Sequence, residues 1–158
     1  ARYRHRLMIF NIISHEQSYA DFVSYLNKSR FKLYDNAVVV IADSRLAALC
    51  IELLYVEKAI VLTDKSPLRD FGRLTTLTEE CWNPRVFRSQ KRLSDREQQI
   101  LSLLVRGYSP NEISDLISVS YKTIQTHKMR IIVKLGLAHS TALNKQIVRF
   151  NHPLSFLS

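Results

Sequence analysis

The chain has 158 residues, of which 46% are hydrophobic and 23% charged, a globular balance that excludes a disordered polymer. Its net charge of +9 indicates a polyanionic partner or an anionic membrane surface. No run approaches the roughly 18 apolar residues of a membrane span, and the basic start is followed by too short an apolar run for a signal peptide. We therefore expect a cytoplasmic protein without a membrane partner.

The first 63 residues alternate strand patterns with helix patterns. Strands are expected at 7–13, buried on both faces, at 31–34 on an edge, at 37–41 and at 59–62. A capping box of Ser14 and Gln17 opens the first helix, and Asp43-Ser44 caps the second. The inward residues are, in the first helix, Tyr19, Phe22, Val23 and Leu26, and in the second, Leu46, Leu49, Cys50, Leu53 and Leu54. This order predicts a small α/β domain with a parallel sheet.

The segment from residue 64 to 92 carries weaker patterns. Ser66-Pro67 indicates a short helix that ends at Phe71-Gly72, and 74–78 is strand or turn. Residues 82–87 fit a last strand or a packing segment. The polar stretch 88–92 is expected to be a linker between domains at 1–87 and 93–158.

Both chain ends and the cysteines leave alternatives open. The basic arm 1–6 is a frayed terminus or a phosphate contact, and 151–158 is expected to be a tail. Cys50 falls on an apolar helix face, whereas Cys81 stands far from it; a disulfide between the two is neither required nor excluded.

Residues 93–137 contain three helix patterns joined by short turns. Ser94 and Glu97 form a capping box, and Gly107 allows a sharp turn. Ser109-Pro110 starts a second helix, Ser120 caps a third and Gly136 ends it. The expected inward residues are Ile100, Leu103 and Leu104, then Ile113, Leu116 and Ile117, then Ile124, Ile131 and Leu135. Two short helices joined by a tight turn after a supporting helix predict a helix-turn-helix.

A fourth helix is expected at 140–150. Ala142, Leu143, Ile147 and Phe150 share one of its sides.

The third helix of this region has an unusual outer face. Its outward residues are Lys122, Gln125, Thr126, Met129 and Arg130, with Lys128 at the flank, and no acid occurs between Tyr121 and Leu137. Mixed charge is the normal pattern of a solvated helix face, so an acid-free face suits contact with phosphate. The alternative is a basic helix that only covers a bundle.

These residues resemble the DNA-binding domain of the LuxR/FixJ (NarL-type) transcription regulators. The pattern of that family is met by Leu93, Ser94, Arg96, Glu97, Gly107, Glu112, Ile113, Thr123, Ile124, His127, Lys134, Leu135 and Gly136. The resemblance covers 93–137 and the helix after it, and implies an all-α four-helix helix-turn-helix domain. It departs from the family at Ser114, Gln125 and Met129.

The resemblance implies double-stranded DNA as partner, read in the major groove. Gln125, Thr126 and Met129 are expected on base edges, because glutamine suits adenine and methionine can contact a thymine methyl. Lys122, Thr123 and Lys128 are expected on the backbone or nearby bases. His127 is either a phosphate contact or hydrogen-bonded to the neighbouring helix. A homodimer or a heterodimer with another regulator is implied, and RNA polymerase is a further possible partner.

The α/β half is similar to the receiver domain of two-component response regulators. A receiver needs an acceptor carboxylate and an acid pair for Mg²⁺. Asp43 and Thr63 end strands, but no acid pair follows the first strand and Lys65 comes too early. We expect a degenerate, shortened receiver-like domain that does not take phosphate by the usual route, with Asp43 as a helix cap.

Enzyme functions have little support. Three glycines cannot build a phosphate-cradling loop, and the five histidines lack metal-ligand spacing, so no catalytic residue, cofactor or metal is expected. Two alternatives to a DNA-binding regulator remain: a sigma-factor-like, polymerase-binding module and a protein-binding antagonist. The first would need a further helical domain in place of the α/β half.

Overall fold

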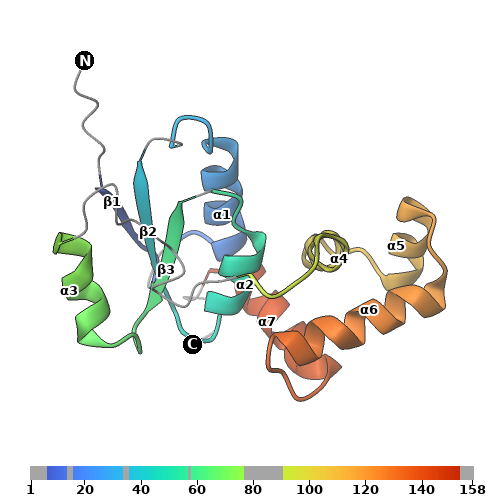
Figure 1. Ribbon diagram of the computed structural model, residues 1–158. Coiled ribbons are helices and arrows are strands. Elements are labelled where there is room, and N and C mark those ends of the chain that lie inside the picture. Colours follow the sequence, from blue (N-terminus) through green and yellow to red (C-terminus); the bar gives the residue numbers. More distant parts are fainter. Residues whose placement is uncertain (1–6, 14–15, 34–35, 57, 77–90, 154–158) are drawn as a thin grey trace.

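The computed structural model describes residues 7–13, 16–33, 36–56, 58–76 and 91–153, and Figure 1 shows their arrangement. The strands β1 (Leu7–Asn11), β2 (Ala37–Ala42) and β3 (Ala59–Thr63) form one parallel sheet in the order β1-β2-β3. Ile9 pairs with Val39, and Val39 with Ile60. The prediction of an α/β half with a parallel sheet is confirmed. The predictions for 1–6 and 82–87, and for Cys81, lie outside the described residues.

Helices cover both faces of this sheet. The helices α1 (Tyr19–Lys28) and α2 (Ala47–Leu53) lie on one face, and α3 (Leu68–Thr76) lies on the other (Figure 1). Every inward residue predicted for α1 and α2 is buried. This face is therefore well packed, because the apolar stripes of both helices join the buried valines of β2 and β3 in one hydrophobic cluster.

The strand β1 is less covered than its sequence suggests. Leu7 is 42% exposed and Ile9 is 53% exposed, so the prediction of burial on both faces was wrong. The reason is that β1 is an edge strand, and α3 packs its Phe71 and Leu74 against β2 and β3.

Three local predictions in the α/β half were also wrong. The cap of α1 is Ser18, whose Oγ accepts a hydrogen bond from the Asp21 N–H at 3.1 Å, and Ser14 lies outside the described residues. Residues 31–33 form a turn and not an edge strand, since the N–H of Leu33 bonds back to the Ser29 carbonyl. The helix α3 runs through Gly72 to Thr76 because a single exposed glycine weakens a helix without ending it.

The second half is four helices: α4 (Asp95–Val105), α5 (Pro110–Ile117), α6 (Tyr121–Lys134) and α7 (Ser140–Asn151). The predicted caps at Ser94, Ser109 and Ser120 are all present, and Ser109 forms a second capping box with Glu112. Gly107 and Gly136 have φ values of +95° and +70°, a conformation that favours glycine. The helix-turn-helix prediction is confirmed.

The burial of these helices departs from prediction in two places. Ile100, Ile113, Ile124 and Ile131 are fully buried as expected, but Leu101 and Val105 take the core positions of α4 while Leu103 and Leu104 are half-buried. Leu116 is 57% exposed, so its predicted burial was wrong. The short helix α5 has only one fully buried residue, Ile113, because it contacts α4 and α6 along a single narrow stripe.

The two halves share one continuous hydrophobic core. The rings of Tyr19 in α1 and Phe150 in α7 meet edge to face at 6.3 Å. The buried carboxylate of Glu52 in α2 accepts hydrogen bonds from the Arg92 N–H at 2.6 Å and from the Gln98 side chain in α4 at 3.2 Å. No described helix is long and apolar enough to cross a membrane.

Candidate nucleic-acid interface

The helix α6 is held by its ends and by one buried stripe. At its start, the Ser120 hydroxyl accepts a hydrogen bond from the Thr123 N–H at 3.2 Å. Ile124, Ile131 and Ile132 are buried against the neighbouring helices. This stripe fixes the rotation of α6, so the side chains on its opposite side are presented to solvent.

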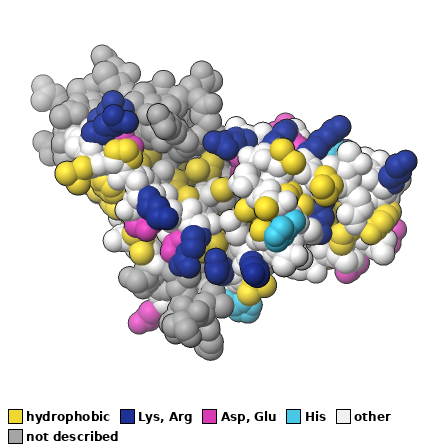
Figure 2. All heavy atoms as spheres, turned by 90° about the horizontal axis from the view of Figure 1, so that it is seen from below, with side chains coloured by type: hydrophobic (Ala, Val, Ile, Leu, Met, Phe, Trp, Pro, Cys, Tyr) yellow, Lys and Arg dark blue, Asp and Glu magenta, His cyan; other side chains and the backbone are white. Residues whose placement is uncertain are grey.

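The outer side of α6 carries most of the predicted contact residues. Lys122, Thr123, Thr126 and Met129 are exposed, as is Arg130, and Met129 is 58% exposed. Gln125, His127 and Lys128 are half-buried at the flanks. Figure 2, seen from below Figure 1, shows Lys and Arg side chains on this face of the molecule, with hydrophobic side chains among them. The seven residues predicted to contact DNA thus lie on one helix, and four of them are exposed.

The cations of this face are not neutralised by the rest of the described chain. None of the ion pairs among the described residues involves Lys122, Lys128 or Arg130. The helix itself contains no acid, and its first-turn N–H groups add partial positive charge at Tyr121. The arrangement can therefore attract a polyanion and offer it unused donors.

Gln125 has a partner that its sequence position did not reveal. Its side-chain nitrogen donates a hydrogen bond to the Tyr121 hydroxyl at 2.7 Å, one helical turn earlier. Tyr121 is 48% exposed, so this pair stands at the surface. The bond orients the amide and uses one of the two N–H donors of that nitrogen, which leaves the second N–H and Oε1 for the two-point contact with an adenine that its residue type favours.

His127 is turned partly into the protein. Its ring nitrogen Nδ1 is buried and has no hydrogen-bond partner within the part of the chain that the structure describes. The predicted alternative of a hydrogen bond to the neighbouring helix is therefore not seen in the described residues. The ring is half-buried beside the exposed face, so Nε2 is the atom through which it would meet a partner.

An ion pair between the exposed Lys134 and a buried carboxylate secures the far end of α6. The Lys134 ammonium lies 2.5 Å from Glu97 Oε1, and the Glu97 side chain is only 3% exposed. The same Oε1 accepts a hydrogen bond from the Ser94 N–H at 2.9 Å. Burial alone would raise the pKa of Glu97, but the ammonium and the Ser94 donors outweigh it and lower that pKa. Glu97 therefore joins the cap of α4 to the end of α6.

Another polar cluster lies at the carboxyl ends of β2 and β3. Asp43 Oδ1 accepts hydrogen bonds from Arg45 Nε at 2.9 Å and from the Arg45 N–H at 2.8 Å, and Oδ2 meets Nη2 at 2.8 Å. The guanidinium hydrogen bond lowers the pKa of Asp43. The expected role of Asp43 as a helix cap was wrong, because α2 begins after Leu46 without a side-chain cap.

The neighbours of Asp43 also take part in hydrogen bonds within the chain. The Tyr19 hydroxyl accepts a hydrogen bond from the Asp43 N–H at 2.9 Å, and burial raises the pKa of Tyr19 to about 12. Asp64 accepts from the Ser44 N–H at 2.9 Å, and the Thr63 hydroxyl accepts from the Lys65 N–H at 3.1 Å. Within the described ranges no group of three or more His, Cys, Asp or Glu residues could hold a metal ion.

Comparison with known families decides the nature of the helical half. Residues 91–146 match the family described as bacterial regulatory proteins, luxR family. This segment is a LuxR-type helix-turn-helix domain. The match includes α4, α5 and α6 whole and the first part of α7, so every predicted contact residue lies inside it.

Individual relatives match the LuxR-type domain as well. The transcriptional regulatory protein TdiR of Thauera aromatica is 46% identical over 57 residues, which is 36% of this chain and 25% of TdiR. The oxygen regulatory protein NreC of Staphylococcus aureus is 42% identical over 65 residues, 38% of this chain and 30% of NreC. The match thus spans less than a third of either relative.

Among solved structures, a chain in the structure of two RcsB dimers bound to two parallel DNAs is similar to most of this chain. It has a TM-score of 0.49 and 19% identity, and the match covers 94% of this chain and 77% of that one.

Sequence reasoning missed two features of the LuxR-type domain and its setting. Tyr121 was not singled out, although an aromatic residue four positions before Gln125 on one helix is a local signal that could have found their bond. Glu52 was not singled out either. It is hydrogen-bonded to Arg92 and Gln98, which lie 40 and 46 positions further along the chain. A local sequence pattern does not predict contacts between such distant residues.

Proposed function

We propose that this protein is a bacterial, sequence-specific transcription regulator that binds double-stranded DNA with α6 in the major groove. One observation carries the proposal: α6 has no acid, and it presents Lys122, Thr126, Met129 and Arg130 to solvent while its isoleucines are buried. The family match of residues 91–146 supports it. A helix of this width fits the major groove, where base edges can be distinguished.

The side chains divide into two roles. Lys122, Thr123 and Lys128, with His127 beside them, contact phosphates or nearby bases, which gives affinity without sequence information. Gln125, Thr126 and Met129 read base edges. The Gln125 amide is already oriented by Tyr121, which supports its use as a positioned reader.

A single helix reads few base pairs, so we propose that two copies act together on a repeated site. The partner is a second copy of this chain or another regulator, and contact with RNA polymerase would follow from binding near a promoter. Residues 93–158 form the DNA-binding part, 1–87 the regulatory and dimerising part, and 88–92 the linker. Such a regulator works in the bacterial cytoplasm.

The α/β half is not controlled by ordinary aspartyl phosphorylation, and the protein has no enzymatic role. The support is the state of Asp43, whose two oxygens are bonded to Arg45. A phosphoryl acceptor needs a free carboxylate oxygen and a bound Mg²⁺ to balance the incoming charge.

The test is fluorescence anisotropy of the full-length protein with a pool of promoter fragments from the source genome, at several salt concentrations. We expect a few fragments to stay bound at salt that releases the rest, because base contacts add to the phosphate term. Equal binding of every fragment with the same steep salt slope would show that α6 does not read sequence. Absence of binding at low salt would refute DNA binding itself.

A further inference from the structure

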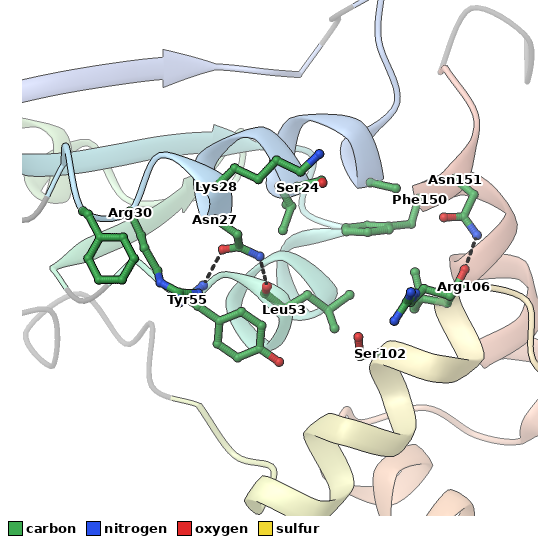
Figure 3. A pocket seen from close by; sticks show the side chains of 14 residues that line it. Ser24, Asn27, Lys28, Arg30, Leu53, Tyr55, Ser102, Arg106, Phe150 and Asn151 are labelled. Carbon is green, nitrogen blue, oxygen red and sulfur yellow. Dashed lines mark hydrogen bonds between the residues drawn. The ribbon is translucent and has the colours of Figure 1, made fainter. Parts of the chain in front are cut away.

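A cavity of about 550 Å³ lies where α1 and the end of α2 meet α4 and α7, a volume typical of small-molecule sites. Its floor is apolar and comes from both halves of the chain: Val23 and Leu53 on one side, Val105 and Phe150 on the other, all nearly or fully buried. The ring of Tyr55 stands beside this floor (Figure 3). The cavity can therefore bury an apolar body between two parts of the protein.

The rim of the cavity is cationic. Lys28, Arg30 and Arg106 surround it from different sides (Figure 3), and none of the described residues that line it is acidic. Arg30 lies over the Phe31 ring at 4.8 Å, and none of the ion pairs among the described residues involves any of the three cations. Three cations without an acidic partner among the described residues, around one apolar floor, would repel a cationic ligand and attract an anion.

The remaining polar groups of the cavity fall into two kinds. The Asn27 side chain is used internally, since it donates to the Leu53 carbonyl at 2.9 Å and accepts from the Tyr55 N–H at 2.7 Å. Asn151 similarly donates to the Val105 carbonyl at 2.7 Å. These bonds hold the walls in place. The hydroxyls of Ser24 and Ser102 have no partner among the described residues, and both line the cavity.

We propose that this cavity is a binding site for a small organic anion with an apolar body, such as an aryl or alkyl carboxylate. The apolar body lies on Leu53, Val105 and Phe150, and the anionic group is held by Arg106 with Lys28 or Arg30. A ligand in this position touches α1 and α2 as well as α4 and α7, so its binding stabilises the packing of the two halves seen here. The site is separate from α6 and does not depend on DNA binding.

The experiment is a titration of the ¹⁵N-labelled full-length protein with 2-naphthoate, followed by amide chemical shifts, beside the uncharged analogue 2-naphthamide. We expect shifts concentrated at Val23, Leu53, Val105 and Phe150, and at least tenfold tighter binding of the anion. The triple variant Lys28→Gln/Arg30→Gln/Arg106→Gln should weaken 2-naphthoate at least tenfold and leave 2-naphthamide within twofold.

A matched control keeps the charge change and moves it away from the cavity. The variant Lys65→Gln/Arg69→Gln/Lys145→Gln loses the same charge and should bind 2-naphthoate as the unmodified protein does. No localised shifts, equal binding of the two ligands, or equal loss in both triple variants would overturn the proposal.

Two further measurements separate this site from a peptide-binding groove and from the DNA-binding face. Hexaglutamate represents an acidic segment of another protein; shifts at the cavity with hexaglutamate but not with 2-naphthoate would mean that the groove holds a peptide and would overturn the proposal. The variant Lys122→Ala/Lys128→Ala should bind 2-naphthoate normally, so a failure of the DNA-binding proposal remains distinguishable from a failure here.

Discussion

The outer face of α6 and the carboxyl edge of the sheet both carry polar side chains, and they use those groups in opposite ways. On α6, Lys122, Lys128 and Arg130 make no ion pair among the described residues. At the sheet edge, Asp43 is bonded to Arg45 and Asp64 to the Ser44 N–H. Unused donors are available to a partner, whereas satisfied carboxylates are available only at the cost of their present bonds. The unused donors of α6 support the proposal of external recognition there, whereas the groups of the sheet edge are used in internal structure.

The largest effect is expected where α6 depends on a buried group. Glu97→Ala removes the Lys134 pair and leaves the Ser94 N–H without its acceptor. We expect a loss of about 2 kcal/mol in the free energy of unfolding, measured by urea denaturation, because a cap and the hydrogen bonds of a buried carboxylate are lost together.

The matched control is Glu112→Ala, which removes the corresponding glutamate of the exposed capping box at Ser109. It should cost about 0.5 kcal/mol, since only an exposed cap is lost. Equal losses in the two variants would show that the Glu97–Lys134 pair does not anchor α6.

A smaller effect is expected from the reading residues themselves. Gln125→Ala should weaken binding to a preferred fragment roughly tenfold and leave non-preferred fragments unchanged, because one base-edge contact is lost. Tyr121→Phe keeps the ring and removes only the hydroxyl that orients Gln125. Anisotropy with both fragment classes measures the two effects. If Gln125→Ala weakened all fragments alike, Gln125 would be a phosphate contact and not a reader.

The smallest effect is expected at the sheet edge. Incubation with acetyl phosphate and Mg²⁺ should add no phosphoryl group, because both Asp43 oxygens are engaged by Arg45. Asp43→Asn should therefore leave DNA affinity within about twofold, as expected of a surface bond far from α6. Intact-mass measurement detects any added phosphoryl group, and anisotropy measures the DNA affinity of Asp43→Asn. Phosphorylation of the unmodified protein that is absent from Asp43→Asn would contradict this account.

A structural feature could be predicted from the sequence when the contacts that determine it join residues close together in the chain. Caps and turns such as Ser94, Gly107 and Ser120 act within three or four residues, so their patterns predicted the helix ends correctly. Ile124 and Ile131 in the inward stripe of α6 followed from its period for the same reason, whereas Leu135 is only half-buried and the buried Ile132 was missed.

The predictions of burial failed where residues distant in the sequence determine whether a side chain is covered. Leu116 fits the helical period of α5, but no neighbouring element in the described part of the chain covers it. Ile9 fits a strand buried on both faces, but β1 lies at the edge and α3 packs elsewhere. Glu52 is buried where the Arg92 N–H and Gln98 of α4 bond to it. The period of a segment predicts which side chains share a face and does not say whether another element arrives to cover that face.

The candidate site follows the same division. The helix and its outward residues could be read from the chain, whereas the half-burial of Gln125, His127 and Lys128 depends on the helices around them. The cavity between α1 and α7 could not be predicted at all, because its lining residues come from separate segments between Ala20 and Asn151.

The central claim is that the cations of α6 contact DNA, and one double variant tests it most directly. Full-length Lys122→Ala/Lys128→Ala is compared with the unmodified protein by anisotropy across salt concentrations, beside Lys65→Ala/Arg69→Ala, which loses the same charge from the α/β half. We predict a roughly 10- to 100-fold loss of affinity at low salt and a salt slope smaller by about two for the α6 variant alone. An unchanged affinity and slope in that variant would contradict the account.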